Sequence, residues 1–237
     1  MRTIIFSDVH GEPDIIGAVV GHSSFDSSVD RLIFAGDAIE IGRDSSGCLD
    51  LLEKLGAECL VGNHEWGAFT GEPIEGMPLD PALVGRVEEF VASGRWRLAT
   101  TVDDVLITHA GVGQQLASDL GLSAGDGPEN TARALNAEFD RAVAGSFPAR
   151  GNIVGNSGPL WWRPDGWDAP MAGMCQVVGH TPPEIIDEVG SAARLMEKGV
   201  YLVDPFVRGW RQRSFQPPTP IRYAVIEDGV VRLVEGR

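Results

Sequence analysis

Short runs of apolar residues alternate along the chain with longer stretches in which apolar residues recur at helical spacing. The short runs are rich in β-branched side chains and stop at polar residues, which is the pattern of buried strands. We expect strands at residues 3–6, 31–35, 58–61, 96–102, 105–108, 176–178 and 200–203, and a closing hairpin around Asp228-Gly229.

The stretches between these strands carry helix signals. An apolar stripe follows Pro13, which suits the first turn of a helix, and residues 45–55 place leucines at helical spacing before Gly56. Asp80-Pro81 has the pattern of an N-cap followed by the first helical residue, and this helix would run to Gly94. Helices that alternate with strands predict an α/β protein.

Two further segments have mixed patterns. Residues 113–146 are mainly helical in pattern, with an interruption at 121–128, and we expect them to form a cap beside the sheet. Residues 152–170 are rich in Gly, Pro and Trp and predict an ordered loop over the functional site, whose tryptophans favour packing over recognition. No internal repeat or change of composition divides the chain, so we expect one domain over residues 1–237.

The composition narrows the functional classes. Of the 237 residues, 43% are apolar and 22% are charged, as in a globular protein. The net charge of −15 argues against a nucleic-acid partner, and a protein this acidic needs metal cations to handle phosphates. Three cysteines without C-x-x-C spacing argue against a disulfide framework or a zinc–thiolate site. We see no signal peptide and no run long enough to cross a membrane, and therefore expect a cytoplasmic protein.

Five of the predicted strands end in residues that can bind a metal ion. These residues are Asp8 with His10, Asp37, Asn63, His109 and His180. If the chain stays extended after the first strand, alternate side chains share a face, so Asp8 and His10 would reach one ion together. Strand ends in α/β sheets share one edge, so the whole set should converge. Each residue alone has a commoner structural explanation, such as a turn or a core histidine, and only the set indicates a metal site.

The donor types indicate which metals this set would hold. Nitrogen and oxygen donors without thiolates suit Mn, Fe or Zn. Six ligands exceed what one catalytic ion needs when it keeps a position for water, so two ions with a bridging carboxylate fit better. The fifth histidine, His22, lies in a serine-rich segment and is expected in an exposed loop.

The strand-end motifs resemble those of the calcineurin-like metallophosphoesterases. The motifs are Ser7-Asp8-Val9-His10-Gly11, Gly36-Asp37, Gly62-Asn63-His64-Glu65, His109-Ala110-Gly111 and Gly179-His180-Thr181. Their order and spacing are most similar to the bacterial protein-serine/threonine phosphatases and the diadenosine tetraphosphatases, over residues 1–204. The resemblance implies a four-layer fold, in which a central β-sandwich is flanked by helices.

The same resemblance implies roles for the site residues. Asp8 and His10 would hold the first metal ion, Asp37 would bridge, and Asn63, His109 and His180 would hold the second. His64 would be the catalytic acid. In an extended chain it points away from Asn63, so it would face the leaving oxygen and not the same ion. Two ions, manganese or else iron or zinc, would lower the pKa of a water between them and supply hydroxide for in-line attack.

The sequence departs from the family pattern after Asp37. Glu40 stands where the family has an aspartate that orients the catalytic histidine, and it is one methylene longer. Ile41 occupies the position of a phosphate-binding arginine. Arg43 could reach the same oxygens or could be a surface residue. Arg163, after two tryptophans, resembles the second phosphate-binding arginine of the bacterial members.

These features favour a dinuclear-metal phosphoesterase that hydrolyses phosphomonoesters, with a phosphoprotein or a small phosphorylated molecule as substrate. A dinucleoside polyphosphate hydrolase is the alternative within the same chemistry, with Trp161, Trp162 and Trp167 as a stacking platform for a base. A binding module that has lost catalysis is the alternative from another class, because Ile41 replaces an arginine. The oligomeric state stays open.

Overall fold

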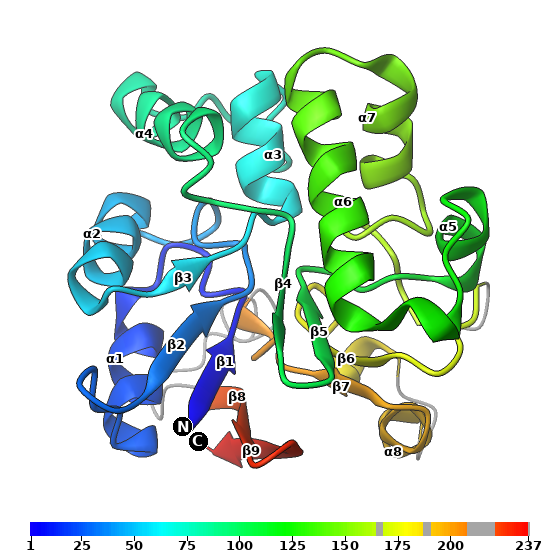
Figure 1. Ribbon diagram of the computed structural model, residues 1–237. Coiled ribbons are helices and arrows are strands. Elements are labelled where there is room, and N and C mark those ends of the chain that lie inside the picture. The colour runs from blue at the N-terminus through cyan, green and yellow to red at the C-terminus, as the bar shows by residue number, and fades with distance from the viewer. Residues whose placement is uncertain (165–167, 187–190, 208–220, 237) are drawn as a thin grey trace.

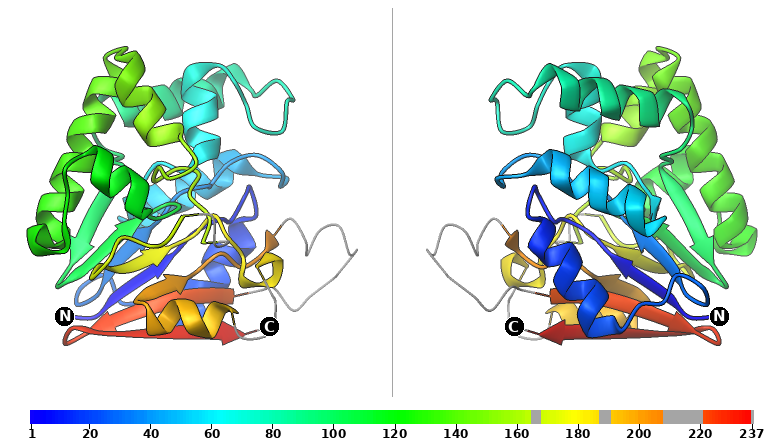
Figure 2. Two further views of the ribbon diagram at one scale, coloured as in Figure 1. Left: turned by 90° about the vertical axis from the view of Figure 1, so that its right-hand side faces the viewer. Right: turned by 90° about the vertical axis from the view of Figure 1, so that its left-hand side faces the viewer.

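The computed structural model describes residues 1–164, 168–186, 191–207 and 221–236 (Figure 1). Its strands form two sheets that lie face to face, and helices cover the outer faces (Figure 2). No helix in these four ranges is long and apolar enough to cross a membrane.

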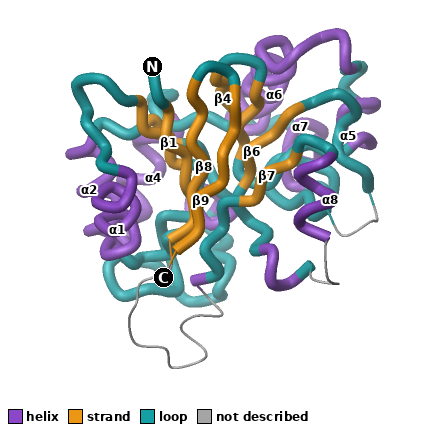
Figure 3. The backbone as a smooth tube through the Cα atoms, turned by 90° about the horizontal axis from the view of Figure 1, so that it is seen from below, coloured by secondary structure: helices purple, strands orange, loops and turns teal. Residues whose placement is uncertain are grey.

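The first sheet has the strand order β3-β2-β1-β8-β9. Its strands are β1 (Thr3–Phe6), β2 (Arg31–Phe34), β3 (Glu58–Cys59), β8 (Ile221–Glu227) and β9 (Val230–Gly236). The three N-terminal strands are parallel, and β8 pairs antiparallel with the free edge of β1. Figure 3 shows β1, β8 and β9 side by side. Asp228 and Gly229 have positive φ angles of 52° and 73°, as the hairpin signal predicts.

The second sheet has the order β4-β5-β6-β7. Its strands are β4 (Ala99–Val102), β5 (Val105–Thr108), β6 (Cys175–Val178) and β7 (Val200–Leu202). The pairs β5–β6 and β6–β7 are parallel, whereas β4 is antiparallel to β5. Parallel strands of both sheets therefore deliver their carboxyl ends to one region.

Alternating side chains along the strands build the layers. Ile5 of β1 and Ile33 of β2 pack between the sheets with Ile107 and Val177 of the second sheet. Residues on the other face of β1, such as Phe6, belong to the core beneath the outer helices. Because successive strand residues point to opposite faces, a strand covered on both sides must be apolar throughout. The predicted four-layer fold with a central sandwich is confirmed.

Helices occupy the outer layers. They are α1 (Pro13–Ser23), α2 (Ser45–Leu55), α3 (Asn63–Thr70), α4 (Pro81–Ala92), α5 (Gln114–Asp119), α6 (Gly127–Val143), α7 (Phe147–Val154) and α8 (Ser191–Glu197), with 3-10 turns at Ala124–Asp126 and Pro183–Ile185. Figure 1 shows α1 and α2 on the side of the first sheet and α6 beside β4 and β5. Helix α2 has the predicted bounds, with the Asp44 side chain accepting a hydrogen bond from Gly47 N at its start.

Several segments differ from the sequence prediction; β3, for example, ends at Cys59 and not at residue 61. The expected strand 96–102 begins only at Ala99, and the preceding Trp96 is a buried core residue. Helix α7 covers residues 147–154, part of which the sequence assigns to a loop; Pro148 suits its first turn. His22 is exposed as expected, but it lies in the last turn of α1, where its Nδ1 is 2.8 Å from the Tyr223 hydroxyl.

The helical segment 113–146 contributes to the outer layer of the second sheet. Its longest helix, α6, packs against β4, β5 and α7. None of the described residues that line the cavity at the strand ends comes from this segment.

Candidate metal centre and active site

The loops after β1 and β2 are joined by backbone hydrogen bonds. Asp8 N donates to Gly36 O at 2.9 Å, and His10 N donates to Asp37 O at 2.9 Å. The expectation of an extended chain here is wrong, because Asp8 and His10 have positive φ angles of 54° and 44°. Asp and His tolerate the left-handed region better than most residues. The turn still brings the pair together, with His10 Nε2 at 3.8 Å from Asp8 Oδ1.

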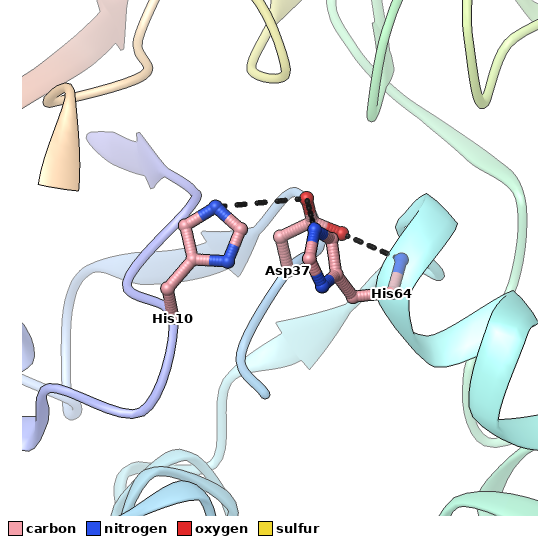
Figure 4. A group of neighbouring side chains, drawn as sticks. All are labelled: His10, Asp37 and His64. Carbon is pink, nitrogen blue, oxygen red and sulfur yellow. Dashed lines mark hydrogen bonds and ion pairs between the residues drawn. The ribbon is translucent and has the colours of Figure 1, made fainter. Parts of the chain in front are cut away.

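Asp37 lies at the centre of the predicted metal ligands. Its Oδ2 is 3.8 Å from His10 Nε2, 3.8 Å from His64 Nε2 and 3.4 Å from His109 Nε2. Figure 4 shows the His10 ring beside this carboxylate, with the His64 ring overlapping the carboxylate in this view. Its other oxygen accepts a hydrogen bond of 3.1 Å from His64 N, at the start of α3. One carboxylate thus faces donors from both sheets.

Asn63, His109 and His180 form the second half of the cluster. Asn63 Oδ1 is 2.8 Å from His109 Nε2 and 3.1 Å from His180 Nδ1. His109 Nδ1 lies 2.9 Å from the Ala35 carbonyl oxygen, which can only accept, so Nδ1 carries the proton and Nε2 presents a lone pair. That lone pair faces the oxygens of Asn63 and Asp37. Three electron-pair donors that face one another repel unless a cation lies between them, so this arrangement fits a metal ion.

Burial makes an unpaired charge unfavourable at these residues, and a bound cation would compensate the charge of the carboxylates. Burial raises the pKa of Asp8 and Asp37 well above the usual range, and neighbouring carboxylates raise it further. Burial lowers the pKa of His109 to about 3 and that of His180 well below its ordinary value, so both rings are neutral donors near pH 7. His180 Nε2 is buried without a hydrogen-bond partner among the described residues. The donor set therefore fits metal binding.

Two overlapping groups place their ligand atoms within 4.8 Å of one another. They are His10, Asp37 and His64, and Asp37, His109 and His180. Asp37 is common to both, as expected of a bridging ligand. Asp8 has one oxygen occupied, since Oδ2 accepts from Ser7 Oγ and from His180 N at 2.9 Å, which leaves Oδ1 toward His10.

His64 is held by Glu40. Its Nδ1 lies 2.7 Å from Glu40 Oε2, and the same carboxylate accepts hydrogen bonds from the backbone N–H groups of Ile74 at 3.2 Å and Glu75 at 3.1 Å. Burial alone would raise the pKa of Glu40, but its hydrogen bond with His64 and the backbone donors hold it below the ordinary value. The longer side chain therefore makes the contact that the sequence assigns to it.

The segment that carries Asn63 and His64 is helical, not extended. Both residues lie in the first turn of α3, after Gly62 as N-cap. Successive helical side chains still diverge, so Asn63 faces the histidines of the second sheet and His64 faces Glu40. Any residue other than glycine at position 62 would clash, because its Cβ would lie 2.1 Å from Asp37 Oδ1.

A cavity of about 230 Å³ opens beside the metal ligands. Arg163 and Ile41 both line it, and Arg163 Nη1 donates to His180 O at 3.1 Å. Arg43 is not among the described lining residues; its side chain is 76% exposed and lies 3.5 Å from Glu12. The structure therefore brings Arg163 to the ligands and leaves Arg43 at the surface.

The three tryptophans considered as a stacking platform for a base do not all line the cavity. Trp162 is fully buried in the core with Val178 and Leu202. Trp161 is half-buried and lines the cavity, with its ring centroid 5.4 Å from that of His180. Trp167 lies outside the described residues.

Sequence reasoning did not assign two acidic residues that the structure places in or beside the centre. Asp204 lines the cavity after β7, and burial raises its pKa to about 7. Glu65 is fully buried and accepts hydrogen bonds from the N–H groups of Asp37, Ala38 and Gly62 at 2.8–2.9 Å. Glu65 belongs to the motif Gly62-Asn63-His64-Glu65, and Asp204 directly follows the predicted strand 200–203, so an available signal marked both positions.

Comparison with known proteins agrees with this geometry. The family model described as calcineurin-like phosphoesterase matches residues 1–216. No protein of curated function matches the sequence.

Solved structures share the fold at low identity. A cold-active protein tyrosine phosphatase is 16% identical with a TM-score of 0.64, covering 98% of this chain and 78% of its own. A proposed diadenosine tetraphosphatase is 17% identical with a TM-score of 0.58, covering 100% and 94%. A protein serine/threonine phosphatase from Saccharomyces cerevisiae is 12% identical with a TM-score of 0.57, covering 100% and 80%.

Proposed function

Because the chain belongs to the calcineurin-like phosphoesterase family and is a metal-dependent hydrolase, we propose that it hydrolyses phosphomonoesters at a centre of two metal ions. The substrate is a phosphoprotein or a small phosphorylated molecule. The single observation that carries the proposal is the Asp37 carboxylate, whose Oδ2 lies within 3.8 Å of the Nε2 atoms of three histidines.

Asp8 and His10 would hold the first ion, Asn63, His109 and His180 would hold the second, and Asp37 would be a ligand of both. When bound, the ions lower the pKa of water, so that hydroxide is available near neutral pH, and they polarise the phosphoryl group. Manganese suits the mixed nitrogen and oxygen donors, as do iron and zinc.

The protein supplies the proton that the leaving group needs. As the bond between phosphorus and the ester oxygen breaks, His64 Nε2–H donates its proton to that oxygen. Glu40, 2.7 Å from His64 Nδ1, accepts the other N–H, fixes the ring orientation and stabilises the protonated ring. Glu40 is therefore a positioning residue and His64 the catalytic acid.

Arg163 binds the phosphoryl oxygens in this proposal. It is the one arginine among the described residues that line the cavity, and its hydrogen bond to His180 O holds it beside the second metal ligand set. A guanidinium suits this role because its N–H groups match the oxygens of a phosphate. Arg43 has no catalytic role in this scheme, since its side chain pairs with Glu12 at the surface.

The alternatives are less well supported. A dinucleoside polyphosphate hydrolase would use several cations and an aromatic platform, but the described cavity contains one guanidinium and Trp161. A binding module without catalysis needs no proton donor beside the metals, whereas Glu40 holds His64 in an orientation that suits one. The same contact would also suit a metal ligand, and the metal content of His64→Asn separates the two roles.

Metal reconstitution of the wild type and Asp37→Asn tests the proposal. The protein is stripped with a chelator and reloaded with Mn²⁺, and metal content and turnover of p-nitrophenyl phosphate are measured. We expect two ions per wild-type chain. Asp37→Asn should lower metal affinity by at least about 100-fold, because second-sphere changes alone cost about 10–100-fold. Asp119→Asn, on the exposed side of α5, is the matched control.

Three results would contradict parts of this proposal. Full activity after complete metal removal would refute metal dependence. Saturation at one ion per chain would refute the dinuclear centre. Bound metal with no hydrolysis of p-nitrophenyl phosphate, a phosphopeptide or a dinucleoside tetraphosphate would favour the binding module.

A further inference from the structure

Part of the lining of the cavity is apolar. We call this part the apolar wall; its residues are Ile41, Ile74, Trp161, Pro182, Ile185 and Phe206. They come from five separate segments: the loops after β2, α3 and α7, and the two segments that follow β6 and β7. Metal ligands line the same cavity, so a phosphate ester bound at the metals would place its organic part among these residues.

Two wall residues hold a backbone conformation that bulky side chains rarely adopt. Ile41 has a φ of 63° and Phe206 a φ of 61°. A β-branched or aromatic residue in the left-handed region is a true outlier, and such strain persists where the surrounding structure imposes it, often at ligand sites. Glycine or asparagine would fit both positions with less strain. The strain therefore indicates that large apolar side chains are useful at this cavity.

The wall also carries apolar surface that water contacts. Ile185 is 51% exposed and Ile74 is 36% exposed, whereas most large apolar residues of the described chain are buried. Exposed apolar surface at a cavity gains free energy when a ligand covers it. A ligand that leaves these side chains exposed to water would gain no binding free energy from them.

Charge and size limit the ligand further. Arg163 is the one guanidinium among the described lining residues, and Asp204 contributes a carboxyl group to the same lining. A single phosphate suits this balance, whereas a polyphosphate chain would leave charges uncompensated. The volume of about 230 Å³ lies below the roughly 300–1,000 Å³ of pockets for drug-sized ligands. This space is sufficient for a phosphate with one ring.

We infer that the apolar wall binds the aromatic ring of an aryl phosphate, as a small molecule or as phosphotyrosine in a peptide. The inference rests on the proposed function, since the phosphate must lie at the metal centre. Trp161 supplies a ring face or edge beside His180, and Ile41 and Ile185 add aliphatic surface to the same lining. Replacement of the family's arginine by Ile41 then exchanges a phosphate contact for a contact with the organic group.

Binding of phosphonates to the Mn²⁺-loaded protein tests the inference without any catalytic step. Phenylphosphonate and ethylphosphonate present the same phosphonate group, and their affinities are compared as dianions, after correction for the second ionisation of each, so that the difference reports the organic group. Isothermal titration calorimetry should give phenylphosphonate an affinity at least about tenfold higher, since burying a few additional apolar carbons is worth this much. Equal affinities would overturn the inference and leave the proposed function intact.

Two variants locate the contact. Ile185→Ser should lower the affinity for phenylphosphonate about fivefold and leave that for ethylphosphonate unchanged. Its exposed position makes loss of folding an unlikely explanation, and Val230→Ser, 58% exposed in the distant hairpin, is the matched control. Ile41→Asn should also lower phenylphosphonate affinity while raising the melting temperature, because asparagine relieves the strained backbone. Unchanged affinity in both variants would contradict the wall assignment.

Turnover identifies the source of the aryl group. Comparable kcat/KM for phenyl phosphate and a phosphotyrosyl peptide would assign small aryl phosphates, and a clear preference for the peptide would assign phosphotyrosine. A preference for a phosphoseryl peptide or for a dinucleoside tetraphosphate would overturn the inference. Absence of hydrolysis with intact phenylphosphonate binding would instead contradict the proposed function.

Discussion

At the scale of single residues, the contact between Glu40 and His64 shows how the site accommodates a glutamate, whose side chain is one methylene longer than that of the family's aspartate. The longer carboxylate reaches His64 Nδ1 at 2.7 Å and also accepts the backbone N–H groups of Ile74 and Glu75. Both oxygens of Glu40 are therefore held in place. Because Glu40 occupies Nδ1 of His64, Nε2 is the ring nitrogen left to donate a proton to the substrate.

Replacement of the proposed acid should separate catalysis from metal binding. We expect His64→Asn to lower kcat by roughly 10²–10⁴-fold with two metal ions retained, because general acid catalysis contributes about this factor. Turnover of p-nitrophenyl phosphate and metal content are the measurements. His22→Asn is the control, since that histidine is exposed at the end of α1. A loss of one metal ion in His64→Asn would make His64 a ligand, and unchanged turnover would remove it from the mechanism.

Individual site residues were predictable where a motif marks them. The strand-end positions of Asp37, His109 and His180 were identified from sequence alone, and the structure brings them together. The left-handed backbone at Asp8 and His10 was not predicted, because it depends on hydrogen bonds to the loop after β2. Asp204 directly follows the predicted strand 200–203, so the rule that identified the other strand-end residues could have included it.

At the scale of elements, the first turn of α3 positions several parts of the site. Its N-cap Gly62 packs against Asp37, its first residue is Asn63, and Glu65 in the same turn binds the loop after β2. The sequence marks no helix here, because residues 63–70 are short and contain Gly67, so periodicity is too brief to detect. The helix is held by tertiary contacts more than by its own propensity.

Removal of the Glu65 carboxylate should destabilise the fold. Glu65→Ala leaves three buried backbone N–H groups without their acceptor, and each such group costs about 1–3 kcal/mol. We expect the free energy of unfolding, measured in urea, to fall by about 3 kcal/mol or more. The control Glu53→Ala removes a carboxylate that pairs with Arg86 and Arg95 at the surface, where about 1 kcal/mol or less is expected. Equal losses in the two variants would show that the Glu65 contacts contribute little.

At the scale of the whole molecule, the proposed metal ligands link the two sheets. Asp8, His10 and Asp37 follow strands of the first sheet, whereas His109 and His180 follow strands of the second. The assignment of strands to two sheets came from the family resemblance and not from the residue pattern. Local patterns indicate where strands occur, but β8 joining the free edge of β1 is a long-range pairing that local patterns do not contain.

Metal binding should therefore stabilise the whole fold. At a concentration about 100 times the dissociation constant, a bound ion adds about 2.7 kcal/mol, which for a chain of this size corresponds to a rise of about 5–10 °C in melting temperature. Thermal unfolding of chelated and Mn²⁺-loaded protein measures this difference. His180→Ala should reduce the rise, and His22→Ala should not. A melting temperature independent of Mn²⁺ would contradict a metal site shared by the two sheets.

The pairing of β1 with β8 has a consequence for synthesis on the ribosome. Thr3 lies opposite Ile226, so one edge of the first strand lacks its partner until nearly all of the described chain has been made. Unpaired strand edges attract other strands, and contacts between residues so distant along the chain form slowly. During synthesis, the unpaired edge of β1 is therefore a site at which chaperones would prevent association with other strands. Translation that stops before β8 would release a product prone to aggregate.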